Sequence, residues 1–70
     1  MGKIPGVNHQ QVVKALQKAG FGIARQGRHI VMTDGRHVVT IPRHNPVNAY
    51  TLFNIVRGAG LTAEHFQTLL

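Results

Sequence analysis

The sequence of 70 residues contains no cysteine and no tryptophan, and only two of its residues are acidic. Without thiols the chain can form neither a disulfide framework nor a thiolate zinc site, which argues against small secreted scaffolds and zinc fingers. The N-terminal stretch has no apolar signal region, and no apolar run approaches the roughly 18 residues that span a bilayer. The composition therefore predicts a soluble cytoplasmic protein without membrane contact.

Positive charge dominates the composition. Eight Lys and Arg residues stand against Asp34 and Glu64 alone, so the formal net charge is +6. Because 43% of the residues are apolar, the chain can bury a core, unlike a disordered basic tail. The charge predicts nucleic acid as the first partner and an acidic protein as the second. The length allows one domain, residues 1–70.

The first helix is predicted over residues 9–19. Asn8 can cap it, and Gln11, three residues later, completes a capping box. Apolar residues then recur at helical spacing, and Gly20 follows where a left-handed C-terminal cap is expected. A short strand is predicted over residues 21–25.

The strongest hairpin signal is Asp34-Gly35, which separates the strand-like stretches 29–33 and 36–41. With these two residues at the centre of the turn, His29 lies opposite Thr40. Alternation then divides the hairpin into two faces. The face predicted to pack on the helices carries Ile30, Met32, Val39 and Ile41, joined by His37 near the turn. The open face carries His29, Val31, Thr33, Arg36, Val38 and Thr40.

The rest of the chain is predicted to be a loop and two helices. Two prolines in residues 42–48 obstruct sheet pairing, and a helix follows from Ala49 with Phe53 extending its apolar stripe. Thr62 caps a last short helix. The whole predicts an α+β two-layer sandwich, αβββα with a short extra C-terminal helix, whose three-stranded antiparallel sheet leaves one face open to a ligand.

Four stretches resemble a known family in their order and spacing. They are KIPGVNHQQVVKALQKAGF, RQGRH, DGRHVVTIP and GAGLTAEHF. Together with the length and the basic charge, they resemble the HicA (YcfA-like) mRNA interferase toxins of bacterial toxin–antitoxin pairs, over nearly the whole chain. The resemblance implies a double-stranded-RNA-binding-domain-like fold, mRNA cleavage without a metal or other cofactor, and inhibition by a HicB-type antitoxin that covers the site.

The same resemblance implies that His29 is the active-site histidine. The family's histidine follows a Gly-Ser or similar pair before the second strand, and here Arg28 stands where a serine or other small residue is common. This departure leaves a second reading open, a non-catalytic RNA-binding module of the same fold. A third reading is a basic partner of an acidic protein.

The chemistry of RNA cleavage is compatible with these residue types. The 2′-hydroxyl of RNA can attack the neighbouring phosphate when a base takes its proton, and the imidazole of histidine is a base near neutral pH. Arg28 and Arg36 could hold the phosphate by forked hydrogen bonds. Gly27 would let the RNA backbone approach His29 closely. The expected products are a 2′,3′-cyclic phosphate and a 5′-hydroxyl.

Further candidates lie elsewhere in the chain. Lys14 and Lys18 share a face of the first helix and could track phosphates. His44, in the loop after the third strand, could line the same groove as His29. No metal site is predicted, since three histidines would have to converge from opposite sheet faces. The sequence leaves a homo-oligomer open.

Overall fold

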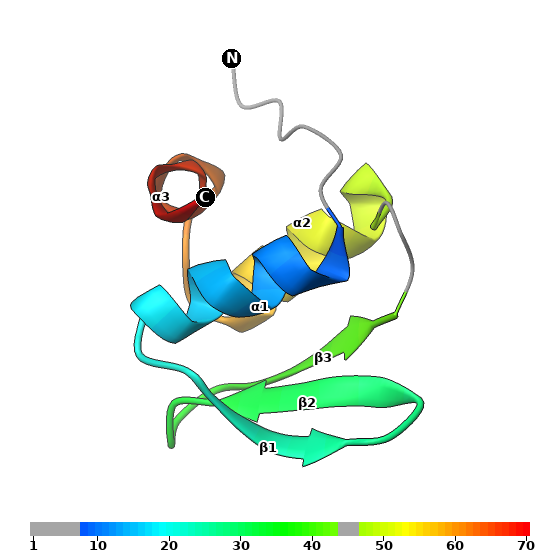
Figure 1. Ribbon diagram of the computed structural model, residues 1–70. Coiled ribbons are helices and arrows are strands. Elements are labelled where there is room, and N and C mark those ends of the chain that lie inside the picture. The colour runs from blue at the N-terminus through cyan, green and yellow to red at the C-terminus, as the bar shows by residue number, and fades with distance from the viewer. Residues whose placement is uncertain (1–7, 44–46) are drawn as a thin grey trace.

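The computed structural model describes residues 8–43 and 47–70 and has two layers (Figure 1). The sheet, in the order β1-β2-β3, consists of antiparallel strands β1 (Gly22–Gln26), β2 (His29–Thr33) and β3 (Val38–Pro42). The helices are α1 (His9–Lys18), α2 (Ala49–Gly58) and α3 (Ala63–Leu69). The first two cover one face of the sheet, and α3 packs against them (Figure 1). The predicted α+β order, αβββα with a short extra helix, is confirmed.

The core lies between the two layers and is apolar. Among the described residues no polar side chain is buried. The buried side chains are Val12, Ala15, Leu16, Phe21, Ile30, Met32, Val39, Ile41, Val47, Leu52, Ile55, Val56, Ala59 and Phe66. All four strand residues that were predicted to face the helices are among them. None of the helices in residues 8–43 and 47–70 has the length and apolar character that a bilayer crossing requires.

Two helix predictions differ in outcome. The capping box is confirmed, because the side chain of Asn8 accepts a hydrogen bond from the backbone of Gln11 and the Gln11 side chain accepts one from the backbone of Asn8. The prediction that Phe53 extends the apolar stripe of α2 is wrong. Its side chain is 45% exposed, because the stripe that meets the core is already filled by Leu52, Ile55 and Val56.

The predicted hairpin register is also wrong, by two residues. Thr33 pairs with Val38, so the four residues 34–37 form the loop. The Asp34 carboxylate accepts hydrogen bonds from the backbone N–H groups of Arg36 and His37, at 2.8 and 2.6 Å, which satisfies these donors inside a wider loop. A shift of two residues leaves every side chain on its predicted face.

The register change gives His29 a different partner across the hairpin. His29 pairs with Pro42 and not with Thr40. Pro42 was expected to obstruct pairing, yet it is the last residue of β3. β3 is an edge strand, and a proline is tolerated there because alternate residues of an edge strand direct their nitrogen away from the neighbouring strand.

Candidate functional site

His29 is the first residue of β2 and is exposed to solvent. Its side chain shares the open face of the sheet with that of Val31, two residues along the strand. Gly27 and Arg28 form the turn that leads into it from β1, and the N–H of Gly27 donates to the carbonyl of His29 at 3.0 Å. His29 lines an open cavity of about 240 Å³. The lining residues are Arg25, Gly27, Arg28, His29, Val31 and Thr40.

Arg25 reaches this cavity because β1 contains a bulge. Ile23 pairs with Met32, but the next pair is Arg25 with Val31, so Ala24 is an extra residue. Without the bulge, Arg25 would share the helix-covered face with Ile23. Sequence reasoning missed Arg25 for this reason, since alternation along the strand contains no sign of the extra residue.

Arg43 contacts the same turn from the β3 edge of the sheet. It follows the end of β3, and its Nε donates a hydrogen bond to the carbonyl oxygen of Gly27 at 2.9 Å. Sequence reasoning missed this residue too. The only signal that could have pointed to it was the expected closeness of the end of the third strand to the start of the second.

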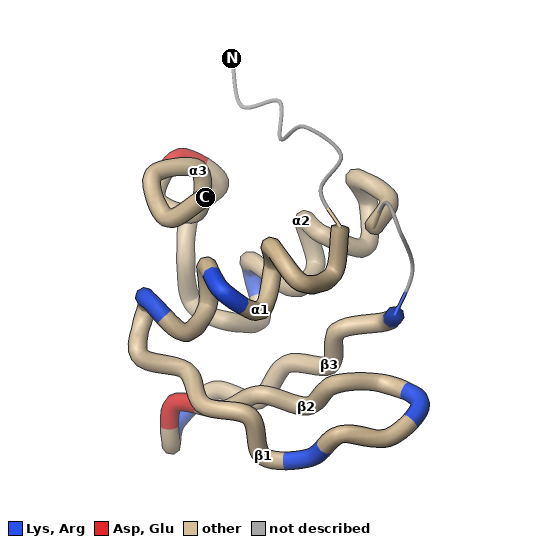
Figure 2. The backbone as a smooth tube through the Cα atoms, viewed as in Figure 1, with Lys and Arg blue, Asp and Glu red and all other residues tan. Residues whose placement is uncertain are grey.

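Positive charge gathers at this end of the sheet. Figure 2 shows basic positions in β1, in the β1–β2 turn and after β3. The only two acidic side chains of the chain lie elsewhere: Asp34 in the loop at the other end of the hairpin, and Glu64 on α3. No acidic side chain therefore reduces the attraction of Arg25, Arg28 and Arg43 for a phosphate.

Arg36 is not brought together with His29. It lies in the loop after Thr33, at the opposite end of β2. A strand advances about 3.3 Å per residue, so the length of β2 alone separates the two residues by more than about 13 Å. The carboxylate of Asp34 holds the backbone of Arg36 in that loop.

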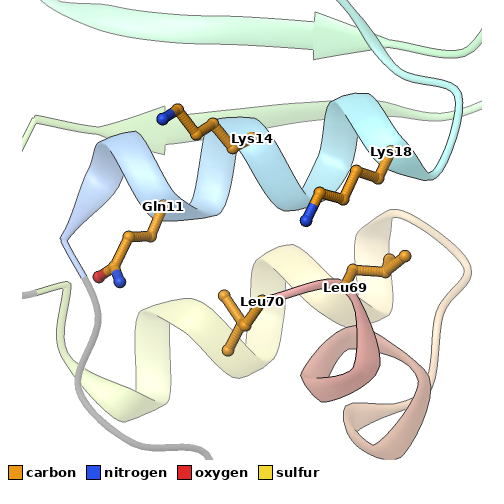
Figure 3. Close-up of a pocket in the computed structure, with 5 residues that line it drawn as sticks. All are labelled: Gln11, Lys14, Lys18, Leu69 and Leu70. Carbon is orange, nitrogen blue, oxygen red and sulfur yellow. The ribbon is translucent and has the colours of Figure 1, made fainter.

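The two lysines of α1 point to different places. In Figure 3 the side chain of Lys14 extends toward the sheet, whereas that of Lys18 extends toward the end of α3. Lys14 also lines a cavity of about 310 Å³ between α1 and the sheet, together with Gln17, Gln26 and Arg43. Both lysines line a second cavity of about 250 Å³, beside Leu69 and Leu70 (Figure 3). Of the two lysines, only Lys14 shares a cavity with Arg43 at the basic end of the sheet.

The remaining histidines do not join His29 in what the structure describes. His44 lies outside the described residues. His37 is half-buried at the other end of the hairpin, with its Nδ1 3.2 Å from Oδ2 of Asp34 and its ring centre 6.5 Å from that of Phe21. Backbone hydrogen bonds from His37 and Arg36 lower the pKa of Asp34 to about 2. Within residues 8–43 and 47–70, no three His, Asp or Glu side chains are grouped closely enough to hold a metal ion.

Comparison with known families decides the identity of the chain. A family model described as HicA toxin of bacterial toxin–antitoxin matches residues 10–61, which is more than half of the chain. The chain belongs to the HicA toxin family. No curated protein matches it significantly, and no solved structure does.

Membership of the HicA family confirms the resemblance seen in the sequence. The chain is therefore a toxin of a toxin–antitoxin system, and members of such a family have an antitoxin as partner. The matched region contains the whole sheet, the β1–β2 turn and Arg43, and it ends before α3.

Proposed function

We propose that this HicA-family chain is a metal-independent endoribonuclease, an mRNA interferase, in which His29 is the general base. The observation that carries the proposal is an exposed imidazole that lines an open cavity together with Arg25 and Arg28, at an end of the sheet without acidic side chains. Cleavage of mRNA would arrest translation, and a HicB-type antitoxin would neutralise the toxin.

The reaction needs one proton acceptor and one anion-binding group. His29 takes the proton of a ribose 2′-hydroxyl, and the resulting oxyanion attacks the adjacent phosphorus. The bond from phosphorus to the 5′-oxygen breaks, and that oxygen leaves with a proton from solvent. The products are a 2′,3′-cyclic phosphate and a 5′-hydroxyl. Arg25 and Arg28 stabilise the negative charge that builds up on the phosphate oxygens.

Other residues contribute to RNA binding. Gly27 has no side chain to obstruct the approach of the RNA backbone. Lys14 extends the basic surface from the sheet onto α1. Lys18 shares a second cavity with Lys14, beside the end of α3, and would contact RNA there. Arg36 can contact only a distant part of the same RNA strand, since it lies at the other end of β2.

The decisive experiment compares two histidine variants on an mRNA substrate in EDTA. We expect His29→Ala to slow cleavage by about 10² to 10⁴-fold, the usual contribution of a general base. His65→Ala removes an exposed histidine from α3 and should leave the rate unchanged. A substrate with a single 2′-deoxyribose at the cleaved position should resist cleavage there. Equal rates for His29→Ala and the parent protein would contradict the proposal.

A second function is favoured by one observation, the arginine that precedes His29. An exposed Arg28 in place of a small residue suits a module that binds RNA without cutting it. In that case the parent protein would bind RNA in EDTA with no cyclic phosphate formed, and His29→Ala would bind equally well. Restoring the small residue by Arg28→Ser would then show whether arginine alone blocks cleavage.

A further inference from the structure

We propose that Arg43 is a positioning residue for His29, a role that rests on the ribonuclease function proposed above. Its Nε donates to the carbonyl of Gly27 at 2.9 Å, across a separation of 16 residues. The hydrogen bond joins the end of β3 to the turn that delivers His29 into β2.

The turn has little else to hold it. Gly27, Arg28 and His29 are all exposed, and a Cβ placed on Gly27 would meet no heavy atom within 4 Å. Apolar packing therefore does not fix this turn. Both backbone polar groups of Gly27 are instead hydrogen bonded, its N–H to the carbonyl of His29 at 3.0 Å and its carbonyl to Arg43. The turn joins β1 and β2, whereas the guanidinium that binds it follows β3.

The position of the turn matters because general base catalysis depends on geometry. The imidazole must lie within hydrogen-bond distance of the 2′-hydroxyl, about 2.6–3.2 Å. Misplacement of a catalytic group by about 1 Å can cost about 10²-fold in rate. A turn released from Arg43 would let the start of β2 move, and His29 is the first residue of that strand.

Arginine suits this position better than lysine does. A guanidinium presents five donors in a planar fork, and the bond to Gly27 uses Nε alone. The side chain also lines the cavity that contains Lys14 and Gln26. A second interpretation is that Arg43 binds a phosphate of the RNA directly. The experiment below distinguishes phosphate binding from positioning of His29.

The test is steady-state cleavage by Arg43→Ala and Arg43→Lys, with Arg57→Ala as the matched control. Arg57 lies in the last turn of α2, and its loss removes the same unit of charge away from the turn. Positioning predicts that kcat falls about 10 to 100-fold in both Arg43 variants while KM changes little. A phosphate contact alone predicts a raised KM in Arg43→Ala, near-normal values in Arg43→Lys, and an unchanged kcat; that result would overturn the proposal.

A second readout does not depend on activity. In the parent protein, the NMR signal of the Arg43 Nε–H should exchange slowly with water. In Arg43→Ala, the carbonyl shift of Gly27 and the backbone order parameters of residues 27–29 should change, with the rest of the spectrum preserved. Unchanged signals at residues 27–29 would overturn the positioning role. If His29→Ala cleaves normally while these signals do change, the assignment of His29 as general base fails but the anchoring of the turn by Arg43 stands.

Discussion

Arg25 lies directly opposite Val31, at the position that Ala24 would occupy if the pairing of Ile23 with Met32 continued regularly. The bulge at Ala24 moves an arginine from the helix-covered side of the sheet to the open side. It thereby places Arg25 in the cavity that contains His29. A bulge of this kind re-aims a side chain without changing the strand order.

From this placement we predict that Arg25→Ala weakens RNA binding. An exposed ion pair contributes about 0.2–1 kcal/mol, which corresponds to a loss of affinity of up to about fivefold. The dependence of log K on log salt should also become shallower by about 0.7, the value for one phosphate contact on a single strand. Fluorescence anisotropy in a His29→Ala background measures both without cleavage. A loss no larger than that of Arg57→Ala would contradict the prediction.

A second prediction concerns Gly60, which follows α2 with a φ of +76°. A Cβ at this position would lie 2.9 Å from Nε2 of His37, so Gly60→Ala adds a steric clash to the strain of a left-handed backbone. Gly20 after α1 has a φ of +99° and open space around it, so Gly20→Ala tests the strain alone. We expect about 1–2 kcal/mol of destabilisation for Gly20→Ala and more for Gly60→Ala.

Urea unfolding of both alanine variants gives the comparison directly. His37→Ala removes the ring that clashes, so the double variant Gly60→Ala/His37→Ala should lose the excess cost of Gly60→Ala over Gly20→Ala. If the two single variants are equally destabilised, the ring of His37 moves aside freely and its contact with Asp34 is not restrictive.

A third prediction concerns stability in acid. The pKa of Asp34 falls from 3.8 to about 2 in the folded state because its carboxylate accepts backbone hydrogen bonds from His37 and Arg36. As pH falls, the unfolded chain binds the proton first, so the contribution of Asp34 is complete above about pH 4 and is lost on the way to about pH 2. Asp34→Asn keeps an acceptor oxygen but cannot titrate. It should therefore lose less stability than the parent between pH 4 and pH 2.

Thermal unfolding across this pH range provides the measurement. Glu64→Gln is the natural control, since Asp34 and Glu64 are the only acidic side chains of the chain. It should retain the acid sensitivity of the parent protein. Asp34→Asn with the same acid sensitivity would show that the hydrogen bonds of the hairpin loop do not set the pH response.

The helices and the faces of the hairpin could be predicted from the sequence because their signals are local. The cap at Asn8 and the alternation of Ile30 and Met32 act within a few residues, and a register shift of two residues does not disturb a pattern of period two. The register itself could not be predicted. It depends on the side chain of Asp34 binding two backbone donors in place of a tight turn.

The candidate site was predictable only in part, for the same physical reason. The sequence, through its resemblance to a family, pointed to His29 and its neighbours Gly27 and Arg28. Arg25 required knowledge of a bulge, and Arg43 required a contact across 16 residues. Both depend on how strands meet in space, which periodicity along one strand does not record.

The last prediction concerns α3, which lies outside the region matched by the HicA family model. Phe66 on this helix is 0% exposed and belongs to the core, whereas Phe53 on α2 is 45% exposed. Phe66→Ala should therefore destabilise the protein by about 3–5 kcal/mol, a large part of the stability of a domain this small. Phe53→Ala removes the same side chain from the surface and should cost less than about 1 kcal/mol. Equal midpoints for the two variants in urea would mean that α3 is not required to complete the core.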